Sequence, residues 1–276
     1  MKKYGLIGWP VKHSVSPPMQ NAGFEAAGIN ASYNLVEVSP DNMQNVIPKM
    51  KKEYAGWNCT VPHKSHIIEF LDEIDKTAEV LNSVNTVVNN NGRLKGYSTD
   101  GYGMEVSLKE NFGTDIKSGS FLFIGAGGAA RATALHFAMQ GAAEIGILNR
   151  TVAKAEKLVD EIVAINSNVS AMADSLTPDK LKPTKYKVVI QCTSIGLKDS
   201  SVSPVTEGFL QKGQFVVDMI YKNTAFLRDA QRCGCETADG KGMLLHQGVR
   251  AWEIWTGRQA PVESMRNALD RVLSKN

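Results

Sequence analysis

Cysteine is scarce in this sequence, and the few cysteines form no recognisable pattern. Only four, Cys59, Cys192, Cys233 and Cys235, occur among 276 residues. A disulfide framework needs paired spacings, and a zinc site needs further thiols or imidazoles close by in the sequence. We therefore expect all four thiols to be reduced and structural, and we expect no metal site.

Long hydrophobic runs and a strong charge of one sign are also missing. No stretch approaches the ~18 apolar residues of a membrane span, and the lysines near the N-terminus are not followed by the apolar segment of a signal peptide. The formal net charge is only +3, and no basic run is interleaved with aromatic residues. These absences predict a cytoplasmic protein that binds neither membranes nor nucleic acid.

The sequence does contain what a globular α/β protein needs. It is 43% hydrophobic and 21% charged, and its length suits two modest domains. Short apolar runs alternate with helical segments, which predicts mainly parallel sheets. We expect strands at 4–8, 33–38, 56–61, 121–124, 144–148, 188–191 and 215–219, a hairpin formed by 85–89 and 93–97, and helices that include 64–74, 76–81, 102–112, 129–140 and 262–273.

A glycine-rich turn follows the predicted strand 121–124. Residues 121–131 read FLFIGAGGAAR, in which Gly125, Gly127 and Ala130 fit the pattern G-x-G-x-x-A. Glycines let a phosphate approach the backbone, and the unpaired N–H groups of the following helix face the anion. A tight turn that packs a strand on a helix is the simpler interpretation. The next strand lies at βαβ distance, so we favour a dinucleotide site.

The end of the next strand, 144–148, carries no acidic residue. An NAD site places Asp or Glu there to bind the ribose 2′-hydroxyl. Asn149, Arg150 and Thr151 stand there instead, followed by Lys154. Positive charge at a helix start opposes the helix dipole, so we interpret these residues as a site for the 2′-phosphate of NADP.

Polar residues also mark the ends of predicted strands in the first hundred residues. Ser14 and Ser16 precede a helix start, where they could cap the helix or bind an anion such as a carboxylate. Lys64 and Asp100 follow strands, where ligands bind in parallel sheets. A solvated lysine and a helix-capping aspartate are the simpler interpretations of these two residues.

Several stretches taken together resemble the shikimate dehydrogenase family, which includes shikimate/quinate dehydrogenases. They are GWPVKHSVSPPMQN, GWNCTVPHK, NSVNTV, GYSTDGYG, GAGGAAR, NRT, DMIY and GMLLHQG, in this order over essentially the whole chain. Their order and spacing are highly specific. The resemblance implies an α/β fold of two domains, with a substrate-binding domain formed by 1–101 plus 240–276 and a Rossmann-like NADP-binding domain formed by 102–239.

The resemblance also implies roles for individual residues. Lys64 and Asp100 match the catalytic pair. Substrate-binding positions are matched by Ser14 and Ser16 at the carboxylate, by Asn85 and Gln247 at ring hydroxyls, and by Thr60 and Tyr221. Cofactor-binding positions are matched by Gly125, Ala126, Gly127, Gly128, Ala129, Ala130, Asn149, Arg150, Thr151, Lys154, Thr193, Ile220, Gly242 and Met243. Gln20, Ser98 and Asn223 depart from the family pattern, which commonly has His, Asn and Pro at these positions.

The activity implied by the resemblance is the reversible reduction of 3-dehydroshikimate to shikimate by NADPH, a step of aromatic amino-acid biosynthesis. Lys64 would donate the proton and Asp100 would position it. Two alternatives stay open: a quinate/shikimate dehydrogenase with broader substrate or NAD use, and a non-catalytic regulator that binds NADP or shikimate. Retention of both Lys64 and Asp100 disfavours the regulator. We expect small-molecule partners and a monomer or homodimer.

Overall fold

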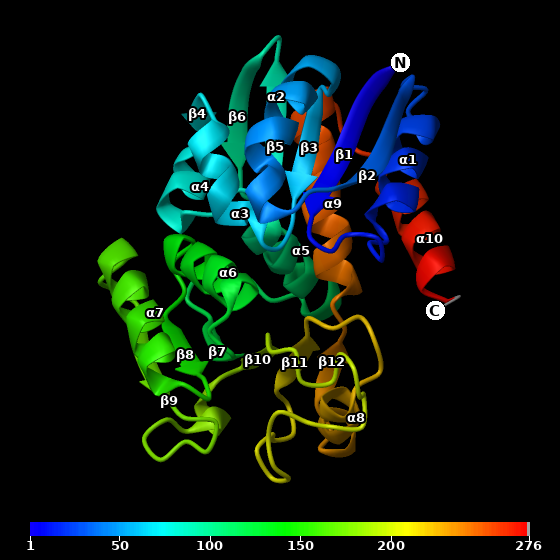
Figure 1. The fold of residues 1–276 in the computed structure, drawn as a ribbon. Helices are drawn as coiled ribbons and strands as arrows, with labels where there is room; N and C mark the ends of the chain where they lie inside the picture. Colours follow the sequence, from blue (N-terminus) through cyan, green and yellow to red (C-terminus); the bar gives the residue numbers. More distant parts are fainter. Residues whose placement is uncertain (275–276) are drawn as a thin grey trace. The chain divides into compact units, whose positions relative to one another are not determined.

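The computed structural model describes residues 1–274, and the chain forms two compact units. Unit 1 consists of Met1–Thr99 and Leu245–Asn276, and unit 2 consists of Asp100–Leu244. Each unit has one six-stranded sheet with helices packed against it (Figure 1). Within residues 1–274, no helix has the length and apolar character needed to cross a membrane.

The sheet of unit 1 is mixed. Its strands are β1 (Lys2–Gly8), β2 (Ala31–Glu37), β3 (Gly56–Cys59), β4 (Glu73–Ile74), β5 (Thr86–Asn90) and β6 (Arg93–Tyr97), in the order β2-β1-β3-β5-β6-β4. β1 is parallel to β2 and β3, whereas β5 is antiparallel to β3 and β6. The antiparallel pairing of β5 with β6 confirms the predicted hairpin, which turns at Asn91-Gly92.

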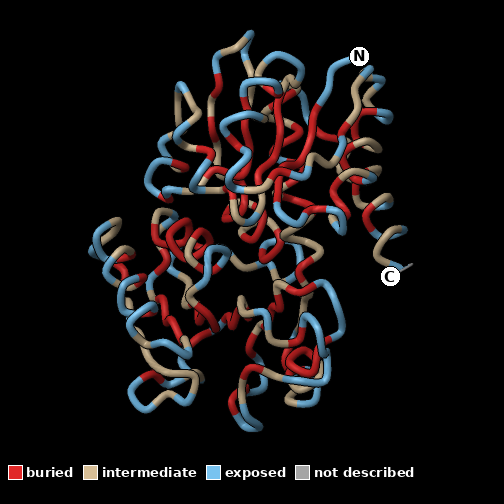
Figure 2. The backbone as a smooth tube through the Cα atoms, in the orientation of Figure 1, coloured by how far each residue is buried: buried red, intermediate tan, exposed pale blue. Residues whose placement is uncertain are grey.

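Helices cover both faces of this sheet. They are α1 (Ser16–Ala26), α2 (Met43–Glu53), α3 (His63–His66), α4 (Lys76–Leu81), the part of α9 (Lys241–Thr256) from Leu245 on, and α10 (Val262–Leu273). On one face the Tyr4 ring lies 4.9 Å from both Phe24 of α1 and Trp255 of α9. On the other face Ile47 of α2 packs in a buried cluster with Trp57. The central strands are accordingly buried (Figure 2).

The helix predicted over 64–74 is wrong in its second half. Helix α3 ends at His66, a 3₁₀ helix spans Ile67–Phe70, and β4 follows. β4 pairs with β6, and the Asp72 carboxylate accepts the Leu94 N–H at 2.7 Å. Pairing with a strand twenty residues away outweighs the local helical preference here, as tertiary contacts often do.

Unit 2 has the strand order of a dinucleotide-binding fold. Its strands are β7 (Ser120–Ile124), β8 (Glu144–Leu148), β9 (Ser170–Asp174), β10 (Val188–Gln191), β11 (Phe215–Asp218) and β12 (Glu236–Ala238), all parallel, in the order β12-β11-β10-β7-β8-β9. Numbered from β7, this is 3-2-1-4-5-6. The helices are α5 (Asp100–Phe112), α6 (Gly128–Met139), α7 (Val152–Ile165) and α8 (Ala225–Arg232). The Rossmann-like prediction is confirmed.

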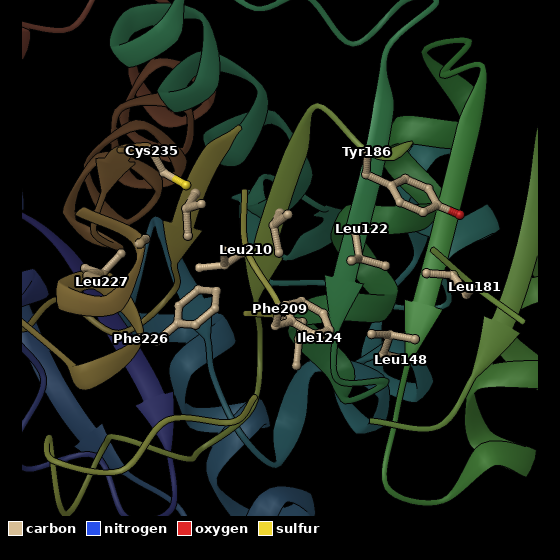
Figure 3. Packing of buried hydrophobic residues seen from close by; sticks show 13 residues of the cluster. Leu122, Ile124, Leu148, Leu181, Tyr186, Phe209, Leu210, Phe226, Leu227 and Cys235 are labelled. Atoms are coloured by element: carbon tan, nitrogen blue, oxygen red, sulfur yellow. The ribbon is translucent and has the colours of Figure 1, made fainter. Parts of the chain in front are cut away.

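The sheet of unit 2 is covered on both faces. On one face Leu122 and Leu148 pack in a cluster with Phe226 of α8 (Figure 3). On the other face the rings of Phe121 and Phe123 lie 4.7 Å and 5.7 Å from Phe137 of α6. Strands buried on both faces need apolar side chains at every position, which explains the continuous run in FLFI.

Candidate active site

The glycine-rich turn after β7 forms an open anion cradle. Gly125 has a φ of +112°, which favours glycine, and a side chain there would come within 3.0 Å of the Thr193 Cγ2 atom. Gly127 caps α6 without a side-chain hydrogen bond. Gly127 and Gly128 are exposed and have open space on the side where a Cβ would project. The first N–H groups of α6 are therefore free to bind a phosphate.

The end of β8 is tied directly to this cradle. The Asn149 side chain accepts the Ala126 N–H at 3.2 Å and donates to the Thr151 main-chain oxygen at 2.9 Å. Arg150, Thr151 and Lys154 are exposed, and within residues 1–274 neither basic side chain forms an ion pair. Exposed, uncompensated positive charge beside the cradle fits a dinucleotide that carries a 2′-phosphate.

The loops after β10 and β11 complete the carboxyl edge of this sheet. Thr193 follows β10, while Ile220 and Tyr221 follow β11. Ile220 is buried, whereas Tyr221 is 37% exposed. At the start of α9, a side chain on Gly242 would overlap the Ser107 Oγ of α5, so the two helices approach closely there. Met243 is half-buried beside it.

In unit 1, Ser14 and Ser16 lie together at the start of α1. The Ser14 hydroxyl donates to the Ser16 Oγ at 3.2 Å and accepts the Ser16 N–H at 3.3 Å. The N-cap residue itself is Val15, which offers no side-chain acceptor. The two hydroxyls therefore lie next to each other at the start of α1. The Ser14 Oγ also accepts one N–H group of the first turn, that of Ser16.

Asn85, Gln247 and Thr99 form a second polar group in unit 1. The Asn85 Oδ1 accepts the Thr99 N–H at 2.8 Å, and its Nδ2 donates to the Thr99 Oγ1 at 2.9 Å. The Gln247 Oε1 lies 3.5 Å from the same Nδ2, and the Thr99 hydroxyl donates to the Gln247 main-chain oxygen at 3.0 Å. Thr99 was not predicted from the sequence as part of this group, because its partner Gln247 is 148 residues away.

Lys64 belongs to the same region of unit 1. It is half-buried in α3, and its main-chain oxygen accepts the Val84 N–H at 2.8 Å, next to Asn85. Thr60 is half-buried at the end of β3. His63, the residue before Lys64, is fully buried, and its Nε2 lies 2.6 Å from the Val38 main-chain oxygen. His63 is therefore structural, and it fixes the start of the helix that carries Lys64.

Asp100 is buried at the first residue of α5 and only 6% exposed. The next residue, Gly101, faces α6 so closely that an added Cβ would overlap the His136 side chain. His136 is itself held by Glu105, with its Nε2 2.6 Å from the Glu105 Oε2. The position of Asp100 is therefore set by the close packing of α5 against the helix of the phosphate cradle.

We expect Gly101→Ala to destabilise the protein by about 1–3 kcal/mol, the usual cost of overpacking a buried contact. Chemical denaturation measures the free energy of unfolding. The same substitution should cost less in a His136→Gly background, measured against His136→Gly alone, because the nearest atom to the added methyl group is the His136 Cβ, which glycine lacks. Equal stability of the Gly101→Ala variant and the unmodified protein would contradict this packing argument.

The positions that depart from the family pattern have defined environments. Gln20 is fully buried, and its Nε2 donates to the Gly248 main-chain oxygen at 3.0 Å, which ties α1 to the residue after Gln247. Ser98 is half-buried before Thr99, and Asn223 is exposed. None of the three replaces a group that the proposed chemistry uses.

The described residues hold no group of three or more His, Cys, Asp or Glu side chains arranged for a metal ion. All four cysteines are free thiols. Burial raises the pKa of Cys59 and of Cys192, which keeps these thiols protonated and poorly reactive at neutral pH. The structural role predicted for all four cysteines stays a prediction.

Models of known protein families match three parts of the chain. The shikimate dehydrogenase substrate binding domain matches residues 6–87, the shikimate / quinate 5-dehydrogenase family matches 107–219, and the shikimate 5′-dehydrogenase C-terminal domain matches 240–269. Among curated proteins, shikimate dehydrogenase (NADP(+)) of Desulforamulus reducens is 40% identical over 280 residues, covering 98% of this chain and 95% of that protein.

Two solved structures are similar over nearly the full length. A crystal structure of a shikimate dehydrogenase in complex with NADP⁺ superposes with a TM-score of 0.91 at 38% identity, covering 99% of this chain and 96% of the other. The 5-ketofructose reductase of Gluconobacter sp. strain CHM43 superposes with a TM-score of 0.90 at 36% identity, covering 98% of each chain. This chain therefore belongs to the shikimate dehydrogenase family.

Proposed function

We propose that the protein is an NADP-dependent shikimate dehydrogenase, which reversibly reduces 3-dehydroshikimate to shikimate. The observation that carries the proposal is the cradle at Gly125–Gly128 tied by Asn149 to an exposed Arg150 and Thr151. This arrangement suits a dinucleotide with a 2′-phosphate. The relative in Desulforamulus reducens bears the name of this activity, and a similar crystal structure contains NADP⁺.

The residues proposed for the cofactor lie in unit 2. The turn from Gly125 to Ala130 would hold the pyrophosphate through the N–H groups at the start of α6, since those of Gly125 and Ala126 already donate within the protein. Asn149, Arg150, Thr151 and Lys154 would hold the 2′-phosphate end. The loops with Thr193 and Ile220 and the helix start with Gly242 and Met243 would take the nicotinamide end. We assign 102–239 to this NADP-binding domain and 1–101 plus 240–276 to substrate binding.

Five of the six residues proposed to bind substrate lie in unit 1. The hydroxyls of Ser14 and Ser16 would bind the carboxylate, and the amides of Asn85 and Gln247 would hold ring hydroxyls. Thr60 would lie beside the ring. Tyr221 in unit 2 would contribute near the carboxylate. Neutral hydroxyls and amides suit a small polyhydroxylated acid.

Lys64 and Asp100 are the proposed catalytic pair. When bound, NADPH supplies the hydride that attacks the carbonyl carbon. Charge then develops on the carbonyl oxygen, and the Lys64 ammonium group would stabilise it and donate the proton. Asp100 would position the ammonium group and share its proton. In the oxidative direction the same groups accept the proton from the hydroxyl of shikimate.

We expect Ser14→Ala and Ser16→Ala each to raise the shikimate KM about tenfold. A hydrogen bond to a charged group contributes about 1.5–3 kcal/mol, and tenfold corresponds to roughly 1.4 kcal/mol. The carboxylate is charged equally in the ground state and the transition state, so kcat should change less than KM. If both serines only cap α1, the variants should instead melt at a lower temperature with an unchanged shikimate KM.

The absorbance of reduced nicotinamide tests the proposed function directly. The purified protein is mixed with shikimate or quinate and with NADP or NAD, in all four combinations. We expect the highest kcat/KM for shikimate with NADP. Strong activity with quinate or NAD would favour the broader quinate/shikimate dehydrogenase. Binding of NADP without any turnover would favour the non-catalytic regulator. The cytoplasmic location and the monomeric or homodimeric state stay predictions.

A further inference from the structure

Two buried polar side chains meet at the carboxyl edge of the sheet in unit 2. Gln191 ends β10 and Asp218 ends β11, and the two residues are paired in register. Both have an exposed fraction of 0%. Neither side chain can therefore touch a ligand, although the loops that follow them carry Thr193, Ile220 and Tyr221.

The orientation of the Gln191 amide is determined by its neighbours. Its Oε1 accepts the N–H of Thr193, a group that can only donate. The Nε2 must therefore point the other way, where it donates to the Ile195 oxygen at 3.0 Å and lies 3.3 Å from the Asp218 Oδ1. Gln191 thus closes the loop after β10 and also reaches across to β11.

The Asp218 carboxylate holds the loop after β11 at both ends. Its Oδ1 accepts the Ile220 N–H at 2.9 Å, and its Oδ2 accepts the Thr224 hydroxyl at 2.7 Å. Thr224 also accepts the Leu227 N–H at 3.4 Å as the N-cap of α8. Burial raises the pKa of the Asp218 carboxyl, while these hydrogen bonds favour its charged form. A carboxylate accepts on both oxygens, whereas an amide of the same size has only one oxygen that can accept.

Both loops pack closely against neighbouring backbone. A Cβ added to Gly125 would lie only 3.0 Å from the Thr193 Cγ2 atom. A side chain on Gly240, just before α9, would overlap the Met219 oxygen. The loops after β10 and β11 therefore lie against the phosphate cradle and the start of α9, and a shift of either loop moves groups proposed to bind the nicotinamide end.

We propose that Asp218, together with Gln191 and Thr224, is a positioning residue that holds the Thr193 loop and the Ile220–Tyr221 loop for hydride transfer. The inference rests on the proposed function, because it assigns these loops to the nicotinamide end of NADP. Asp218 acts only through the groups it orients. Its removal should therefore disturb the nicotinamide end and leave the adenosine end, held by Asn149 to Lys154, unchanged.

Asp218→Asn tests this assignment, because asparagine has the size of aspartate but only one oxygen that can accept hydrogen bonds. We expect the Kd of NADP to rise about tenfold and kcat to fall about tenfold or more, since a small misplacement of reacting groups is costly. The Kd of adenosine 2′,5′-bisphosphate, which lacks the nicotinamide end, should not change. Isothermal titration gives both Kd values without turnover.

Asp174→Asn is the matched control. Asp174 also ends a strand of this sheet, β9, and holds the following loop through the N–H groups of Ser175, Lys180 and Leu181. That loop lies at the opposite edge of the sheet from β11. We expect this variant to be less stable than the unmodified protein, with an unchanged ratio of the two Kd values.

Thr224 provides a second test should Asp218→Asn fail to fold. Thr224→Val keeps the shape of the side chain but removes the hydroxyl that donates to Asp218, whereas Thr224→Ser keeps this hydroxyl. We expect the valine variant to raise the NADP Kd selectively and the serine variant to restore it. Equal losses in the affinity for NADP and for the bisphosphate, or no loss in either, would overturn the proposal. If the unmodified protein lacks shikimate activity, the proposed function fails while the two affinities still test the loops.

Discussion

Replacing Lys64 with alanine is expected to lower kcat for shikimate oxidation by roughly two to four orders of magnitude, the usual range for a general acid–base group. The shikimate KM should change much less, because Lys64 acts mainly on charge that develops in the transition state. The variant should fold, since the hydrogen bond from Val84 goes to the main-chain oxygen of Lys64. Steady-state kinetics with NADP measure both constants.

Two further variants make the Lys64 result interpretable. Lys76→Ala removes an exposed lysine from the start of another short helix of unit 1, α4, and should keep the kcat of the unmodified protein. Asp100→Asn keeps the size of a buried side chain but replaces the carboxyl group with an amide. We expect it also to lower kcat strongly. A near-normal kcat for Lys64→Ala would overturn the proposed mechanism.

A double substitution, Arg150→Ala with Thr151→Asp, is expected to weaken NADP far more than NAD. It removes the positive charge beside the phosphate cradle and introduces the acid that a ribose 2′-hydroxyl prefers. Each charged hydrogen bond contributes about 1.5–3 kcal/mol, so losing two should shift the NADP-to-NAD ratio of kcat/KM by about two orders of magnitude or more. Initial rates at varied NADP and NAD give this ratio.

The control for the cofactor variant is Lys157→Ala, which removes an exposed positive charge further along α7. We expect its NADP-to-NAD ratio to match that of the unmodified protein. Such a result would mean that Arg150 and Thr151, rather than the overall charge of α7, produce the preference for NADP over NAD. Equal kcat/KM for NADP and NAD in the unmodified protein would contradict the interpretation of this strand end.

The sequence by itself determined the elements whose signals are local. The turn at Asn91-Gly92 predicted the hairpin of β5 and β6, and the helix 262–273 has the bounds of α10. The run FLFI followed by glycines predicted β7, the cradle and α6. In these segments turn chemistry and apolar periodicity act over a few residues, so a single sequence contains all the information required.

Only the tertiary structure decided which distant residues act together. The strand β4 exists because β6 pairs with it, although residues 64–74 have helical spacing. Thr99 contacts Asn85 and Gln247, and Gln191 reaches Asp218, because strand order and register bring them together. Register depends on packing across the whole sheet, which no local pattern encodes. The sequence therefore indicated the separate groups of the candidate site, and the fold determined which buried side chains orient them.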